Sequence, residues 1–100
     1  MNKLIAIIAI MLCTTAYADT CDTLSDLSGG VMTLRQKGVP MKTVFSKFSD
    51  EEYPIFGKYI RVKIKQAYKE PRFTTAEYQN NAILDFENEA YSKCIEVLDK

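Results

Sequence analysis

The sequence predicts an all-α fold, a small bundle of about four helices with one disulfide that joins the N-terminus to the C-terminal helix. Three observations support this prediction. Apolar residues recur every three or four positions, capping residues and prolines separate the apolar segments, and two cysteines stand far apart in the chain. Apolar residues at this spacing form one buried face of a helix.

The first eighteen residues have the pattern of a cleaved export signal. Lys3 supplies a positive charge, residues 4–12 are apolar, and the Ala-Tyr-Ala segment 16–18 is the small-x-small pattern behind which signal peptidase cuts. The mature protein is therefore expected to be one helical domain, residues 19–100, in the periplasm or secreted. The apolar run is too short for a membrane-spanning helix, which needs about 20 residues, and no later segment comes close.

Cleavage of residues 1–18 would leave two cysteines, Cys21 and Cys94, in an oxidising compartment where disulfides persist. They are expected to pair. Their disulfide would close a loop of most of the mature chain, and the loss of entropy in the unfolded chain would stabilise the fold by about 4 kcal/mol. The alternative is a lipoprotein signal at Cys13, which is disfavoured because the preceding residue, Leu12, is large.

The first helix of the mature chain is expected to start after Asp22 or Thr23 and to end at Gly38, which suits the C′ position. Gly29 and Gly30 interrupt it at a cost of about 1 kcal/mol each. They indicate either a flexible binding hinge or the close packing of another helix, and the second interpretation is favoured. The expected inward residues have 3-4-3 spacing: Leu24, Leu27, Val31 and Leu34.

A short second helix is expected from Pro40 through Phe48. Proline suits the first turn of a helix and commonly follows the glycine that ends the helix before it. The expected inward residues are Met41, Val44, Phe45 and Phe48.

The central segment 60–65 alternates apolar and basic residues and would, taken alone, indicate a half-buried strand. A wider window favours a helix. Ser49 and Glu52 have capping-box spacing, Pro54 is tolerated in a first turn, and Pro71 stops the segment. The apolar and aromatic residues at helical spacing are Tyr53, Phe56, Ile60, Ile64, Ala67 and Tyr68.

The last helix has the clearest start. Thr74 and Glu77 have capping-box spacing, and Phe73 and Tyr78 suit the hydrophobic staple that accompanies such a box. A helix is therefore expected from Thr75 to about residue 98. Its expected buried face consists of Ile83, Phe86, Ala90, Cys94 and Val97.

Charge is separated along the chain. Residues 35–72 hold ten basic and four acidic residues, a net charge of about +6, whereas both flanks are acidic. On a helix, five of these basic residues form a stripe: Lys58, Arg61, Lys65, Lys69 and Arg72. The stripe indicates either a surface for a protein or another anionic component of the envelope, or a solvated helix face that neighbouring acids partly compensate.

No catalytic, metal or cofactor site is expected. The sequence contains no histidine, which removes the commonest general base and most zinc sites. Glu87 and Glu89 are two residues apart and would diverge on a helix, so they are a poor pair for glycoside hydrolysis. The nearly neutral mature chain and its exported location also disfavour nucleic acid as a partner.

Three segments of the chain, 34–41, 67–73 and 81–86, together with the cysteine pair, resemble a group of small exported proteins of gammaproteobacteria and their phages. This group is functionally uncharacterised. The resemblance implies a helical, disulfide-bridged fold and implies no active site.

Two functions are compatible with these patterns. The first is a non-catalytic interaction protein of the periplasm, such as an inhibitor or modulator of an envelope or phage-lysis protein. The second is an acid-stress chaperone whose helices loosen when carboxylates protonate while the disulfide keeps the chain together.

Overall fold

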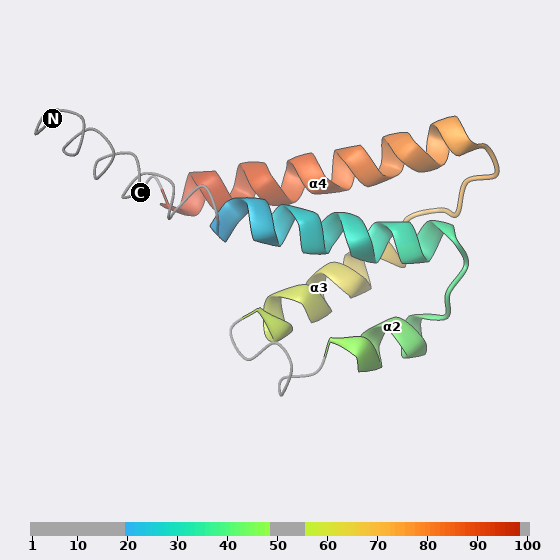
Figure 1. Ribbon diagram of the computed structural model, residues 1–100, viewed down its shortest axis with the longest axis horizontal. Coiled ribbons are helices and arrows are strands. Elements are labelled where there is room, and N and C mark those ends of the chain that lie inside the picture. The colour runs from blue at the N-terminus through green and yellow to red at the C-terminus, as the bar shows by residue number, and fades with distance from the viewer. Residues whose placement is uncertain (1–19, 49–55, 99–100) are drawn as a thin grey trace, which may run out of the picture.

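The computed structural model describes residues 20–48 and 56–98, and these residues form four helices. α1 spans residues 20–36 and is the unlabelled blue-to-teal helix in Figure 1. It is followed by α2 (Met41–Lys47), α3 (Gly57–Ala67) and α4 (Ala76–Leu98). The long helices α1 and α4 lie side by side and run in opposite directions, while α2 and α3 lie along one side of α1 (Figure 1). The predicted all-α bundle is confirmed.

Some sequence predictions lie outside the described residues. These are the export signal at residues 1–18 and the possible helix start formed by Ser49, Glu52, Tyr53 and Pro54. Among the helices that are described, none combines the length and the apolar character needed to cross a bilayer.

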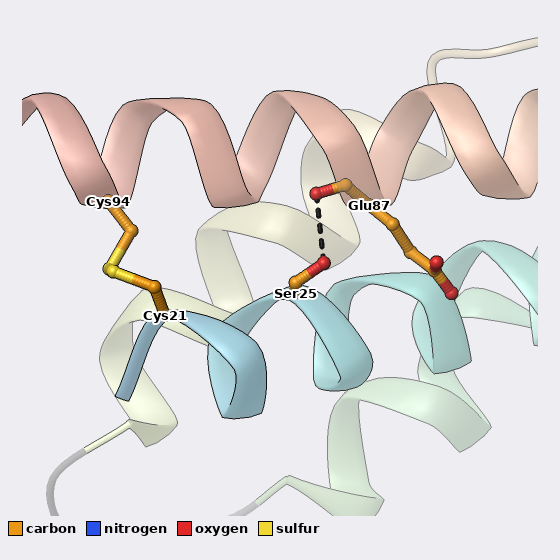
Figure 2. The surroundings of a disulfide bond; sticks show 4 residues. All are labelled: Cys21, Ser25, Glu87 and Cys94. Carbon is orange, nitrogen blue, oxygen red and sulfur yellow. Dashed lines mark hydrogen bonds between the residues drawn. A yellow bond between two sulfur atoms is a disulfide. The ribbon is translucent and has the colours of Figure 1, made fainter. Parts of the chain in front are cut away.

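A disulfide joins Cys21, in the first turn of α1, to Cys94 in α4, as predicted. The two Cα atoms lie 5.5 Å apart. One helical turn further along, the Ser25 hydroxyl donates a hydrogen bond of 3.0 Å to the carbonyl oxygen of Glu87 (Figure 2). The antiparallel pair of long helices is therefore held by a covalent bond and an adjacent hydrogen bond.

The core receives side chains from all four helices. Ile60, Ile64 and Ala67 are fully buried on one face of α3, so the helical interpretation of the central segment is confirmed and the strand alternative is wrong. The buried core cluster consists of Val31, Met32, Val44, Ile60, Ile64, Ala67 and Phe86.

Two residues predicted to face inward are exposed. Val97 is 70% exposed because it lies in the last turn of α4, where the described residues form an open groove instead of a closed core. Met41 is 38% exposed because it begins α2, and the core contact of that helix is made one turn later by Val44. In both cases the apolar face of the helix extends beyond the part of the helix that packs against other helices.

Gly38 occupies the C′ position after the end of α1, as predicted. The predicted start of this helix after Asp22 or Thr23 is wrong, because residues 20–23 are already helical. The backbone of Gly38 has φ 82°, a left-handed conformation that glycine adopts without a steric penalty. Its N–H donates to the carbonyl of Arg35, and the N–H of Val39 donates to the carbonyl of Leu34, both at 3.0 Å. These two bonds form a Schellman motif, which satisfies carbonyls that the helix end would leave free.

The segment between α3 and α4 is hydrogen-bonded to the end of α1. The side-chain amide of Gln36, only 3% exposed, donates to the carbonyl of Pro71 at 3.0 Å and accepts from the N–H of Phe73 at 2.8 Å. The Arg35 guanidinium donates to the carbonyl of Glu70 at 3.1 and 3.2 Å. Gln36 thereby fixes where α3 stops and where the chain turns toward α4.

α4 begins one residue later than predicted. The N–H of Tyr78 donates to the Thr75 hydroxyl at 3.3 Å, which makes Thr75 the N-cap instead of Thr74 and moves the helix start to Ala76. The predicted Thr74–Glu77 capping box is therefore wrong by one position. The Phe73 and Tyr78 rings still lie together, with centroids 6.1 Å apart.

Gly29 and Gly30 meet different surroundings in α1. A Cβ atom at Gly29 would lie 2.5 Å from Cγ of Glu87, so α4 packs closely over this position, as the favoured interpretation of the glycine pair expected. Figure 2 shows the Glu87 side chain reaching from α4 toward α1. At Gly30 a Cβ atom would meet nothing within 4 Å among the described residues. Close packing of another helix therefore explains the glycine at position 29 and not the one at position 30.

We expect Gly30→Ala to raise the free energy of unfolding by about 1 kcal/mol, because alanine removes the entropic cost of glycine in a helix and enters open space. Gly29→Ala is the matched control, with the same gain in helix propensity but a collision with Glu87. Its gain should be clearly smaller. Urea denaturation measures both, and equal effects of the two variants would contradict the packing assigned to Gly29.

Candidate binding site

α3 presents a basic surface to solvent. Lys58 and Lys65 are exposed, Arg61 is partly buried, and Val62, 47% exposed, lies among them. We call these four residues the α3 face. Lys69 is also exposed, two residues beyond the end of α3 at Ala67. The structure thus brings together the first three basic residues of the predicted stripe and places the fourth just past the helix.

Arg72 has a different environment. Its guanidinium donates to the carbonyl oxygens of Gln36 at 3.0 Å and Lys37 at 3.4 Å. These carbonyls lie at the C-terminal end of α1, where a positive charge is favourable. Arg72 thus serves the end of α1, and we leave it out of the candidate site.

A groove of about 450 Å³ lies beside the α3 face, between the start of α1, α3 and the last turns of α4. Its described lining contains two charged residues, Lys63 and Lys93, and no acidic residue. Val62 belongs to both the groove and the α3 face, so the two are continuous. The aliphatic walls of the groove are Leu24, Val62, Val97 and Leu98.

Lys63 is the residue that the sequence patterns missed. It is only 3% exposed, and its ammonium lies 5.4 Å from the ring centroid of Tyr59 and 5.6 Å from that of Phe86. Such cation–π contacts partly replace the lost hydration of the ammonium. The burial of Lys63 could have been predicted from its spacing, because it follows Ile60 by three residues and precedes Ala67 by four, on the buried face of α3.

Burial lowers the pKa of Lys63, since the charged form is desolvated; nearby Glu89 acts in the opposite direction. Burial likewise raises the pKa of the Tyr59 phenol. Glu89 forms an ion pair of 3.0 Å with Lys93, and this hydrogen bond lowers the pKa of the Glu89 carboxyl. In the described part of the chain, Lys63 is therefore a cation near a carboxylate but without an ion pair of its own.

The arrangement is suited to binding an anionic group. In the regions that the structure describes, no group of three or more acidic, cysteine or histidine side chains is placed to hold a metal ion. The positive charges, in contrast, occur both on an exposed helix face and inside an apolar groove.

No protein-family model matches this sequence, and neither a curated protein nor a solved structure is significantly similar to it.

Proposed function

We propose that the protein is a non-catalytic interaction protein of the periplasm, or a secreted one, that binds an acidic partner through the α3 face. The observation that carries this proposal is the grouping of Lys58, Arg61 and Lys65 around the exposed apolar side chain of Val62. The partner is a protein or another anionic component of the envelope, and an inhibitor or modulator of an envelope or phage-lysis protein is the form of this function that we favour.

The combination of charge and apolar surface supports this proposal over a merely solvated helix. Basic side chains steer an acidic partner and set its orientation, whereas burial of an apolar side chain slows its dissociation. Val62 is nearly half exposed although it lies between charged residues on a helix whose other side packs in the core. Covering Val62 would add hydrophobic free energy to the electrostatic attraction.

Charge reversal tests the proposal. We expect the double substitution Lys58→Glu and Lys65→Glu to reduce capture of the partner about tenfold or more in crosslinked periplasmic extract, because it replaces attraction by repulsion. The capture should also weaken as salt concentration rises.

Lys37→Glu with Lys42→Glu is the matched control. It makes the same change in net charge at two exposed lysines, because Lys37 lies one residue past the end of α1 and Lys42 is the second residue of α2. Capture should be unchanged in the control. Equal loss in both double variants would show a nonspecific charge effect, and no loss in either would contradict a role for the α3 face.

The acid-chaperone alternative requires carboxylates whose protonation releases the fold. The lowered pKa of Glu89 means that its pairing contributes stability above its unfolded pKa, which is lost as pH falls through the folded pKa. Both members of the Glu89–Lys93 pair are more than half exposed, however, so the contribution is small. A hydrophobic dye that binds strongly at about pH 2 to 3 would revive this alternative.

A further inference from the structure

We propose that the groove between α1, α3 and α4 binds a single-chain fatty acid, with the carboxylate at Lys63 and the alkyl chain along the aliphatic walls. This site goes beyond the proposed function, because the α3 face is a surface for a macromolecule and the groove is a pocket for a small amphiphile. The two roles share only Val62.

The ammonium of Lys63 is the first argument. A buried charge is unfavourable unless an opposite charge or hydrogen bonds compensate it. The ammonium of Lys63 lies over two aromatic rings, and the nearby carboxylate of Glu89 is hydrogen-bonded to Lys93, so in the described residues Lys63 has no ion pair of its own. A carboxylate in the groove would give Lys63 a direct partner.

The charge of the lining is the second argument. Lys93 is already paired with Glu89 at 3.0 Å, which leaves Lys63 as the ammonium of the described lining that has no ion pair of its own. One ammonium matches the single negative charge of a carboxylate. A cationic amphiphile would meet two positive charges and no acidic residue in the described lining.

The walls and the size of the groove are the third argument. Val97 is 70% exposed and Val62 47%, so an alkyl chain would cover apolar surface that now contacts solvent. The volume of about 450 Å³ is in the range of small-molecule sites, which span roughly 300–1,000 Å³. A stable protein interface buries roughly 1,200–2,000 Å² and would extend well beyond this groove.

Binding of dodecanoate, below its critical micelle concentration, tests the proposal by NMR titration of the oxidised mature protein. We expect saturable binding of one molecule, with the largest shifts at groove residues. Dodecanol and dodecyltrimethylammonium carry the same chain without the negative charge and should bind at least tenfold more weakly.

Lys63→Met should weaken dodecanoate binding about tenfold or more, because methionine keeps an unbranched apolar side chain over the rings but removes the charge. Lys58→Met is the control, since Lys58 is exposed on the same helix and outside the groove lining. Val97→Glu should also weaken binding, because it places a negative charge in the groove wall. Val97 is exposed, so this variant tests the proposal even if Lys63→Met disturbs the fold.

Absence of binding would overturn the proposal. So would equal affinity for dodecanol, which would mean that the groove selects only apolar chains, or unchanged affinity in both Lys63→Met and Val97→Glu. The proposal would also be overturned if the protein were a dimer in the absence of dodecanoate with the groove residues in its interface, because the groove would then be occupied by a second copy of the chain. None of these results bears on partner capture by the α3 face.

Discussion

Replacement of Cys21 and Cys94 together by alanine is expected to lower the free energy of unfolding by about 4 kcal/mol. The disulfide spans 73 positions of the sequence, so it removes much of the conformational freedom of the unfolded chain. Small domains have a total stability of roughly 5–15 kcal/mol, and this loss would be a large share of it. Guanidinium or urea denaturation, followed by circular dichroism, measures the change.

Reduction of the wild-type protein is the matched control for this variant. Cys21 is fully buried, so alanine substitution changes local packing as well as the covalent link. Reduction removes only the link. The two losses should agree within about 1 kcal/mol if loop constraint is the main effect. A loss below about 1 kcal/mol after reduction would show that α1 and α4 are held together mainly by their packing.

Gln36→Met is expected to cost about 2–4 kcal/mol, the second largest effect. Methionine has a similar length but would leave the carbonyl of Pro71 and the N–H of Phe73 without the side chain that now pairs both of them. Gln36 is 3% exposed, so water has little access to replace these bonds. The measurement is again the free energy of unfolding in urea.

Gln79→Met is the control for Gln36→Met. The amide of Gln79 donates a single hydrogen bond, of 2.8 Å, to the carbonyl of Phe73 in the same connecting segment, and Gln79 is only partly buried. Its substitution should cost about 1 kcal/mol or less. If both variants lost the same stability, Gln36 would have no special role in joining the end of α1 to the segment between α3 and α4.

Much of the fold followed from local sequence patterns. The apolar spacing of α3 predicted that Ile60 and Ile64 share its buried face, and glycine at position 38 predicted the end of α1, because helical register and helix capping depend on interactions within a few residues. The errors at Val97 and Met41 have a different origin. Helical periodicity shows which side of a helix is apolar, but other elements decide how far along the helix that side is covered.

The candidate site was predictable only in part. The basic residues of α3 could be placed on one face from their spacing. The function of Arg72, in contrast, depended on the carbonyls at the end of α1, which lie 36 and 35 residues away in the sequence. The burial of Lys63 was not predicted, because a lysine in a segment that alternates basic and apolar residues is expected to face solvent. Its burial depends on the rings of Tyr59 and Phe86, the second of which comes from another helix.

The claim that the α3 face is the binding surface is tested most directly by a photo-crosslinking amino acid placed at Val62 in cells. Leu84 on α4 is the control position, since it is 54% exposed against 47% for Val62. The proposed function predicts a discrete adduct at position 62 that disappears when Lys58 and Lys65 are changed to glutamate, and no such adduct at position 84. Equal adducts at both positions, or an adduct at position 62 that survives the charge reversal, would contradict it.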